Sequence, residues 1–421
     1  MWAGSSFRAH TPLPRYAGDD TVTMTRLAIT GIGIIAPGAI GSTEFAKLLE
    51  SGRTAAMPVD RFDTVGLRAH TAALVRDFKP RDFINVTKLR RMNTLSRYAL
   101  SAARLAINNR GEELPPGTGV ALGTAFGPVQ TSVDYMREYV EKGAALAPPQ
   151  LFAESVANAP GSHVAIDLGL RGFNVTVTQR ESSALAALMF ASSQLAKGTA
   201  PTALVGGIEE INEMVFSVLD RIGALAHANG AVDECARPFD RHRNGMIIGE
   251  GSAILVIDAA PKRPPCAYVS GFGIARDITA TISDWGEGHA SVASAMRLAI
   301  DDAELVPADV DAIYASANST VRGDRLEYQA IQDVFEEVPP VVATKGYFGE
   351  YAAGGALQLA SAAIAIETQT LHCSVGFTAG EDAMRFAPTR ETRRGELRHV
   401  LVNSVSAGGG IVCVVLSREA E

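Results

Sequence analysis

Aromatic residues and basic charge are scarce in this 421-residue chain. Aromatics make up 6% of the residues, and 38 Lys and Arg stand against 46 Asp and Glu, which leaves a net charge of −8. Nucleic-acid-binding proteins need concentrated basic surface, so this balance argues against that class. The sequence also has no run of 18 apolar residues and therefore predicts no membrane span. We expect a cytoplasmic protein that binds neither nucleic acid nor a membrane.

Clustered metal ligands are missing as well. The eight histidines are dispersed and show no i, i+4 pairing of the kind that a zinc-binding helix needs. The cysteines are far apart and form no C-x-x-C pair: Cys235, Cys266, Cys373 and Cys413. Cys373 and Cys413 lie in apolar surroundings, which predicts buried thiols. We therefore expect no metal site.

The first 24 residues differ in composition from the rest of the chain. Residues 1–24 are rich in Pro, Gly, Ser, Thr and Asp and lack the long apolar core of a signal peptide. This composition predicts a flexible N-terminal extension. Met24 lies just before the first strand-like segment and is a candidate start of translation.

The remaining residues contain an internal repeat. Residues 27–34 (LAITGIGI) and 267–274 (AYVSGFGI) both read as β-branched strands that close in a G-x-G turn. Five further elements follow each of them in the same order: helices 43–51 and 289–303, strands 120–124 and 312–315, strands 174–178 and 340–344, helices 182–197 and 352–367, and strands 202–207 and 399–405. Strands that alternate with helices favour parallel strands joined by crossovers, so we expect two similar α/β halves packed together.

The boundary between the halves is predicted at residues 258–265, where three prolines occur. This places one half at residues 25–260 and the other at residues 261–421. The G-x-G turn at residues 31–33 does not read as a dinucleotide fingerprint, which would continue to a third glycine that opens a helix. Pro37 and Gly38 break the chain there instead. We therefore expect no cofactor.

Several phrases, spread over residues 26–417, together resemble the β-ketoacyl synthase branch of the thiolase-fold superfamily. The most specific phrase is RPFDRHRNGMIIGEGSAILV at residues 237–256, and others are TGIGIIAPGAIG at 30–41, STVRGDRLE at 319–327, ATKGYFGE at 343–350 and NSVSAGGG at 403–410. The resemblance implies a thiolase-like α/β fold in which two duplicated halves form a five-layered αβαβα core.

The resemblance also identifies the positions of the family's catalytic residues. Active members carry a cysteine nucleophile, two histidines, a supporting lysine and a gating phenylalanine in a glycine-rich loop. This chain departs from that pattern at four matching positions: Glu181 for the cysteine, Ser316 and Glu350 for the two histidines, and Ala407 for the phenylalanine. It keeps the family residue at Asp324, Glu327 and Lys345.

These departures change the chemistry that the pocket can perform. A carboxylate at position 181 would form a mixed anhydride that water hydrolyses, so no condensation cycle follows. Without imidazoles, only Lys345 and backbone N–H groups remain to stabilise an enolate, and losing one such donor commonly costs a factor of roughly 10² to 10³. We expect no condensing activity from the chain alone.

A serine nucleophile is a weaker reading of the same segment. No G-x-S-x-G motif surrounds Ser182 and Ser183, and no histidine falls on the site positions. We expect these serines to satisfy backbone N–H groups in the first turn of a helix.

Glu181 and Glu350 occupy positions that lie side by side in active relatives. Two carboxylates in one pocket repel each other, so one should have a raised pKa unless a cation such as Lys345 or Arg180 intervenes. We interpret the pair as an ion-pair cluster that fills an obsolete pocket. There are two alternatives. The pair can instead be read as an acid–base catalyst for another substrate, or as residues that have drifted in sequence without a function.

A ketosynthase-like chain without its cysteine most resembles the chain length factor, or ketosynthase β subunit, of bacterial type II polyketide synthases. The resemblance implies a heterodimer with a cysteine-bearing ketosynthase α subunit that works on an acyl carrier protein. In it, strand 174–178 would pair across a pseudo-two-fold axis, and residues 126–139 and 148–159 would shape the tunnel for the growing chain. Those relatives typically carry glutamine at the cysteine position, so Glu181 is a departure.

Other functions remain open at this stage. One is a malonyl-carrier-protein decarboxylase that generates starter units, although the relatives with that activity keep their histidines. Another is a homodimeric protein that binds an acyl group or a carrier. The short basic stretch at residues 88–91 is either a solvated helix end or a contact for an acidic carrier.

Overall fold

A computed structural model of the protein describes residues 27–419, apart from residues 231, 283, 351–354 and 383. The predicted N-terminal extension at residues 1–24 lies outside these described residues, as does the beginning of the helix predicted at 352–367. In the described part of the chain, no helix is long and apolar enough to cross a membrane.

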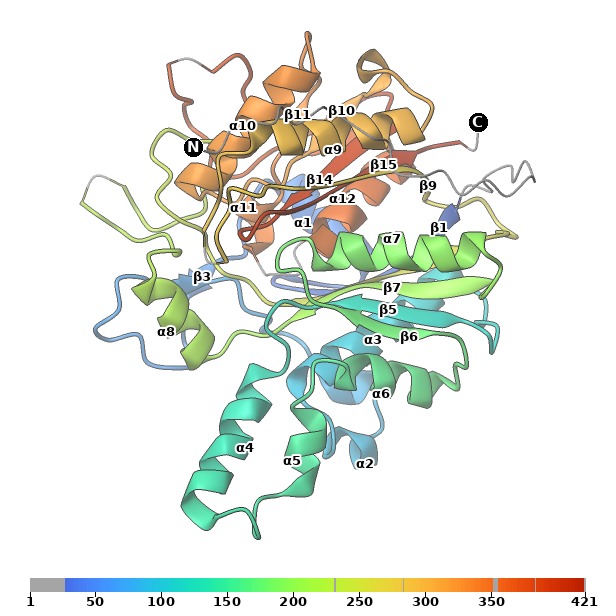
Figure 1. Cartoon of the computed structure of the whole chain (residues 1–421), viewed down its shortest axis with the longest axis vertical. Helices are drawn as coiled ribbons and strands as arrows, with labels where there is room; N and C mark the ends of the chain where they lie inside the picture. Colours follow the sequence, from blue (N-terminus) through green and yellow to red (C-terminus); the bar gives the residue numbers. More distant parts are fainter. Residues whose placement is uncertain (1–26, 231, 283, 351–354, 383, 420–421) are drawn as a thin grey trace, which may run out of the picture.

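A mixed sheet of eleven strands runs through the described residues (Figure 1). The strands of the first half are β1 (Leu27–Ala36), β2 (Ala39–Ile40), β5 (Gly119–Gly123), β6 (Asn174–Val177), β7 (Thr202–Glu209) and β8 (Gly251–Asp258). Those of the second half are β9 (Ala267–Arg276), β10 (Ala312–Tyr314), β11 (Val341–Val342), β14 (His399–Val405) and β15 (Gly410–Ser417).

The strand order repeats between the halves. The first half has the order β6-β5-β7-β8-β1, with β2 attached to β1, and the second has the order β11-β10-β14-β15-β9. Each strand of the second half therefore has a counterpart in the first at the same place along the chain, and β2 is an addition to the first half. The duplication predicted from the sequence is confirmed. The halves meet where β1 pairs with β9, through Leu27, Ala28 and Ile29.

The expectation of parallel strands holds for only part of each half. The three outer strands of each half are parallel, namely β5, β6 and β7 in the first and β10, β11 and β14 in the second. In contrast, β8 is antiparallel to β7 and β1, and β15 is antiparallel to β14 and β9. Residues 406–409 connect β14 to β15 in a tight turn, and a connection that short can only join antiparallel strands.

Helices complete five layers around the two half-sheets. The outer face of the first half is covered by α3 (Thr94–Arg110) and α6 (Ala159–Leu168), and that of the second half by α9 (His289–Asp302) and α10 (Val321–Val334). Between the halves lie α7 (Ser183–Ala196) and α12 (Gly355–Thr368). The predicted five-layered αβαβα core is confirmed.

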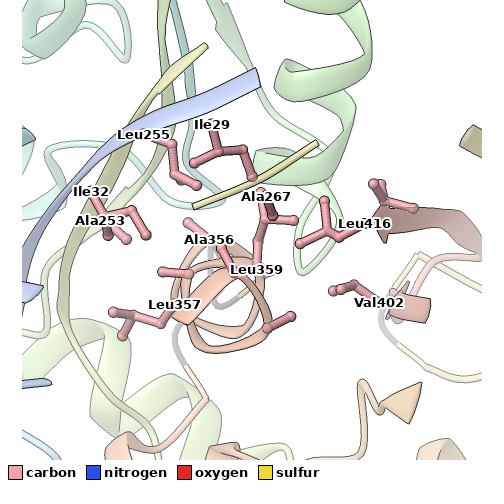
Figure 2. Packing of buried hydrophobic residues seen from close by; sticks show 14 of the residues in the cluster. Ile29, Ile32, Ala253, Leu255, Ala267, Ala356, Leu357, Leu359, Val402 and Leu416 are labelled. Atoms are coloured by element: carbon pink, nitrogen blue, oxygen red, sulfur yellow. The ribbon is translucent and has the colours of Figure 1, made fainter. Parts of the chain in front are cut away.

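The central layer consists of helices that are apolar on nearly every side, as helices buried between two sheets must be. In α12, Ala356, Leu357 and Leu359 are at most 1% exposed. Figure 2 shows them between Ile29 of the first half and Val402 of the second. Small residues in α7 and α12 let the sheets approach closely, which explains the abundance of alanine and glycine and the shortage of aromatics.

The remaining elements are shorter or peripheral: helices α1 (Ser42–Ser51), α2 (Val86–Leu89), α4 (Val129–Lys142), α5 (Pro149–Glu154), α8 (Glu213–Arg221) and α11 (Lys345–Phe348), the 3₁₀ turns η1 (Pro80–Asp82) and η2 (Pro307–Asp309), and the strand pairs β3 (Met57–Pro58) with β4 (Thr71–Ala72) and β12 (Thr370–Leu371) with β13 (Arg393–Arg394). Helices α4 and α5 pack on each other and extend from the body as an arm (Figure 1).

Candidate functional site

The turn between β6 and α7 brings Glu181 into the interior. Arg180 has a φ of 49°, in the left-handed region that non-glycine residues seldom adopt. Ser183 holds this turn closed, because its Oγ accepts a hydrogen bond from the Gln179 N–H at 2.8 Å and donates one to the Arg180 carbonyl at 2.6 Å. Glu181 follows directly, is 5% exposed, and lies just before the N-terminus of α7.

The glycine-rich turn between β14 and β15 lies against this elbow. The Ser182 N–H donates to Ser406 Oγ at 2.9 Å, and Ser404 Oγ donates to the Glu181 carbonyl at 2.8 Å. Ala407 is buried, and it is followed by Gly408 and Gly409 with φ values of 92° and 85°. The turn therefore depends on two glycines that can adopt left-handed backbone conformations.

The two serines after Glu181 bind backbone groups. Ser182 Oγ lies 3.0 Å from the Ser404 carbonyl and 3.2 Å from the Gly410 carbonyl, and it is fully buried. Ser183 is committed to the elbow as described. Both hydroxyls are structural, but the expectation that they satisfy N–H groups of the first helical turn is wrong. Ser182 provides no side-chain cap for α7 and its hydroxyl faces two carbonyls, while Ser183 accepts from the N–H of Gln179, which precedes the helix.

A buried ion pair lies in the second half of the chain. Lys345, the first residue of α11, places its Nζ 2.5 Å from Glu350 Oε2 and 3.5 Å from Ser316 Oγ. Asn318 Nδ2 donates to the same Glu350 oxygen at 3.1 Å. Lys345 and Glu350 are 1% and 2% exposed. The structure thus brings Lys345 and Glu350, at the two ends of α11, together with Ser316, which follows β10.

The charge of Glu350 affects the pKa of Glu181. The pKa of Glu181 is raised to about 7, chiefly by burial and next by the charge of Glu350, while the cations of Arg180 and Lys345 oppose the shift. Burial also raises the pKa of Glu350, against the opposing effects of Lys345 and Asn318. The N-terminus of α7 favours an anion, but it does not outweigh burial. Glu181 Oε2 and Glu350 Oε1 are both buried without a hydrogen-bond partner among the described residues.

The carboxylates of α10 support the loop that carries Ser316. Asp324 accepts hydrogen bonds from the N–H groups of Phe239, Asn318 and Ser319 at 2.7 to 3.2 Å. Glu327 Oε1 accepts from the Ser316 N–H at 2.8 Å and from Asn403 Nδ2 at 2.9 Å. Burial raises the pKa of Asp324 to about 6 and that of Glu327 to about 7.

Three contributors to this site were not singled out in the sequence. Asn318 orients Glu350, and Ser404 and Ser406 join the elbow to the glycine-rich turn. Ser404 and Ser406 lie inside the phrase at 403–410, and Asn318 directly precedes the phrase at 319–327. Their roles depend on contacts between segments more than 200 residues apart in the case of the serines, so no local pattern could reveal them.

The pocket has no thiol and no assembled metal ligands. Cys373 and Cys413 are buried, as predicted, and Cys373 Sγ lies 3.0 Å from Tyr347 Oη. Within the described residues, no group of three His, Cys, Asp or Glu side chains is placed to hold a metal ion. The pocket's own groups can hold a proton and an ion pair, and they offer a carboxylate in place of a thiolate.

The duplicated five-layered fold, with its charged pocket between an elbow and a glycine-rich turn, defines a thiolase-like protein. The family description "Beta-ketoacyl synthase, N-terminal domain" matches residues 24–262, and "Beta-ketoacyl synthase, C-terminal domain" matches residues 266–378. The chain belongs to the β-ketoacyl synthase family.

Curated relatives support this membership over most of the chain. A Streptomyces virginiae protein described as a polyketide beta-ketoacyl synthase 1 is 31% identical over 364 residues, which cover 82% of this chain and 86% of the relative. The 3-oxoacyl-[acyl-carrier-protein] synthase 2 of Coxiella burnetii is 27% identical over 409 residues, which cover 93% of this chain and 98% of the relative.

Solved structures share the whole fold. The ishigamide ketosynthase/chain length factor aligns with a TM-score of 0.86 at 27% identity and covers 94% of this chain and 99% of that one. A type II polyketide synthase ketosynthase solved with its acyl-carrier protein has a TM-score of 0.85 at 20% identity, covers 93% of this chain and 99% of that one, and shows the fold alone. Its structural neighbours thus include a ketosynthase/chain length factor and a ketosynthase of a type II polyketide synthase.

Proposed function

We propose that this chain is the non-condensing, chain length factor subunit of a type II polyketide synthase, which pairs with a cysteine-bearing ketosynthase and shapes the tunnel in which the polyketide grows. One observation carries the proposal. Glu181 occupies the nucleophile elbow, and the groups that pair with it and with Glu350 are Arg180, Lys345 and Asn318 rather than imidazoles.

The chemistry of the pocket favours a partner role. An acyl group on Glu181 would be a mixed anhydride, which water cleaves, whereas condensation needs a stable thioester on the enzyme. Lys345 is engaged by Glu350 at 2.5 Å and is therefore not free to stabilise an enolate. Meanwhile the elbow and the glycine-rich turn remain joined by hydrogen bonds. A chain that lacks the reacting groups but keeps the elbow and the glycine-rich turn in place is suited to act as a structural partner.

An open sheet edge supports pairing with a second subunit. Strand β6 (Asn174–Val177) ends the sheet, and on the described chain it pairs only with β5. It is partly exposed and rich in β-branched residues. Such an edge presents unpaired N–H and C=O groups that another strand can satisfy.

The arm formed by α4 and α5 lies largely within the segments expected from the sequence to shape the tunnel, residues 126–139 and 148–159, and it offers apolar surface. Val140 is 76% exposed, Leu146 69% and Phe152 59%. Tyr135 meets Tyr139 and Phe152 at tilted ring planes, with ring centroids 6.4 and 5.6 Å away. Exposed apolar clusters of this kind mark protein interfaces, and we assign this one to the ketosynthase subunit.

A basic groove beside α2 is a candidate contact for the carrier protein. It has a volume of about 620 Å³ and is lined by apolar and cationic side chains: Phe78, Lys79, Pro80, Arg81, Asp82, Val86, Leu89, Arg90 and Arg97. Lys88 itself forms an ion pair with Asp167 on α6, which indicates a structural role for this lysine. Because the groove combines positive charge with apolar surface, it suits an acidic carrier.

Coexpression with the cysteine-bearing ketosynthase from the same gene neighbourhood tests the proposal. We expect a stable 1:1 complex by light scattering, and polyketide formation from malonyl-loaded carrier protein only when that complex is present. Val140→Glu on the arm should weaken the complex at least tenfold. Val65→Glu, at a valine that is 86% exposed outside the arm, is the matched control and should leave it unchanged.

The other functions give different results in the same experiment. Steady release of acetyl-carrier protein by this chain alone would identify a decarboxylase. A chain that pairs only with itself, and ignores the ketosynthase, would identify a homodimeric binding protein. Either outcome would overturn the proposed subunit role.

A further inference from the structure

Two consecutive glutamates hold the root of the arm against the sheet. Glu209 is the last residue of β7, and Glu210 follows it directly. Glu209 Oε2 accepts hydrogen bonds from the Ala125 N–H at 2.7 Å and the Phe126 N–H at 3.4 Å. Thr124 Oγ1 donates to Glu209 Oε1 at 3.1 Å. The first glutamate therefore binds the segment that leads from β5 into α4.

The second glutamate holds the first turn of α4. Glu210 Oε1 accepts a hydrogen bond from the Gln130 N–H at 3.0 Å. Helix α4 begins at Val129 after Pro128, which provides no side-chain cap. Glu210 thus supplies, from the body of the protein, the acceptor that a capping side chain normally provides. At this end, two carboxyl groups join the arm to the body.

These carboxyl groups are buried without a cation of their own. Glu209 is 0% exposed and Glu210 is 4% exposed. Arg61 lies 2.8 Å from the nearby Glu250, which also accepts from the Ile211 N–H, and in the described part of the chain no cationic side chain forms a salt bridge with Glu209 or Glu210. An ionised carboxylate is costly to bury without a paired charge, so such a group tends to take up a proton.

The electrostatics at the root of the arm agree with this geometry. Burial is the largest cause that raises the pKa of Glu209 to about 8, against the hydrogen bonds that it accepts. Burial is also the largest cause that raises the pKa of Glu210 to about 7; the charges of Glu250 and Asp134 add to the shift, and Arg61 opposes it. The charged and titratable groups that face the two glutamates are Arg61, Tyr98 of α3, Asp134 of α4 and Glu250.

We propose that Glu209 and Glu210 form a pH-sensitive latch, which holds the root of the arm against the body while both side chains are protonated and releases it as they ionise. Opening the root would expose both groups to water, where ionisation carries little cost. The inference goes beyond the subunit role, because it concerns the attachment of the arm within this chain and needs no partner.

The direction of the pH effect follows from the raised pKa values. A group whose pKa is raised in the closed form binds its proton more tightly there than in the open form. It stabilises the closed form fully below its ordinary pKa of 4.5, and this contribution is lost as the pH rises through the raised value. The latch therefore weakens as the pH rises through about 7 for Glu210 and about 8 for Glu209.

Hydrogen exchange of the unchanged protein at pH 6 and pH 8, followed by mass spectrometry, tests the latch. Rates are expressed relative to an unstructured peptide at the same pH, so that the intrinsic effect of pH cancels. We expect the protection of residues 124–142 to fall at least tenfold more than that of α9, which packs on the other half of the protein. Equal falls in the two segments would overturn the proposal.

A glutamine variant then tests whether these two side chains are the cause. Glu209→Gln with Glu210→Gln keeps a neutral acceptor at both positions but removes the titration, so the protection of residues 124–142 at pH 8 should stay within threefold of that at pH 6. Glu141→Gln, at an exposed glutamate of α4, is the matched control and should behave as the unchanged protein does. A full loss of protection in the double variant would contradict the latch.

The measurement on the unchanged protein does not require any variant to fold. Neither experiment involves a ketosynthase partner, so failure here leaves the proposed subunit role to its own test.

Discussion

Two sets of buried carboxylates lie close together in this protein, and they are used differently. Asp324 and Glu327 bind backbone N–H groups of the loop at residues 315–320, although one oxygen of Glu327 is unpartnered. Glu350 is held by side chains, and Glu181 has only Arg180 near its Oε2. By the resemblance, the first set keeps the family's residue types, and the second stands at positions where active members carry cysteine and histidine. The first set binds loop backbone, whereas the carboxylates of the second set meet other side chains.

The largest effect is expected at the cation between the two sets. Lys345→Met removes the ion-pair partner of Glu350 and leaves two buried carboxylates facing an apolar side chain. Breaking a buried pair in this way typically costs about 3–5 kcal/mol, and we expect that loss in the free energy of unfolding at pH 8. Urea titration measures it. The double variant Lys345→Met, Glu350→Gln should recover at least half of the loss, and no recovery would show that the lysine acts through packing alone.

A smaller but clear loss is expected when a backbone-binding acid is changed. Asp324→Asn replaces an acceptor that serves the N–H groups of Phe239, Asn318 and Ser319. An unsatisfied buried donor costs about 1–3 kcal/mol, so unfolding free energy should fall by about 2 kcal/mol at pH 7. Glu181→Gln is the matched amide substitution in the other set. If it destabilised the protein as much as Asp324→Asn, the distinction between the two sets would be wrong.

The smallest effect concerns pH. The pKa of Glu181 is raised from 4.5 to about 7 in the folded protein, so the folded state binds its proton more tightly than the unfolded state does. The resulting stability is fully present below pH 4.5 and is lost as the pH rises through about 7. Burial is the largest cause of this shift; the charge of Glu350 adds to it, and the cations of Arg180 and Lys345 reduce it.

Glu181→Gln should therefore be more stable than the unchanged protein at pH 8, by on the order of 1–2 kcal/mol. The two proteins should be equally stable near pH 4.5. Urea titrations at both pH values measure the difference. An advantage for the glutamine variant that is the same at both pH values would contradict a raised pKa at Glu181.

Much of the fold could be predicted because the duplicated strands and helices are formed by periodic, apolar segments of the sequence. Strand β14 was predicted at its observed bounds, and β1 and β9 were predicted to within two residues. The antiparallel pairing of β8 and β15 was not, because strand direction depends on connections that alternation alone does not reveal. The boundary between the halves at residues 258–265 stays a prediction.

The structure brings together Ser316, Lys345 and Glu350, which the sequence could place only through the family resemblance. The roles assigned to Glu181, Ser316, Glu350 and Ala407 stay predictions. Arg180 was visible from the sequence only as a nearby cation. Its position beside Glu181 depends on a left-handed φ and on a hydrogen bond to the Ile282 carbonyl, 102 residues further along the chain, and local sequence specifies neither.

The measurement that tests the central claim most directly is condensation with each subunit's elbow altered in turn. The chain is assembled with the cysteine-bearing ketosynthase, and product from malonyl-loaded carrier protein is followed by mass spectrometry. Replacing the partner's cysteine by alanine should abolish product, whereas Glu181→Gln with Glu350→Gln should leave turnover within about twofold. A large loss of turnover in that double variant, with the complex still assembled, would contradict the non-condensing role.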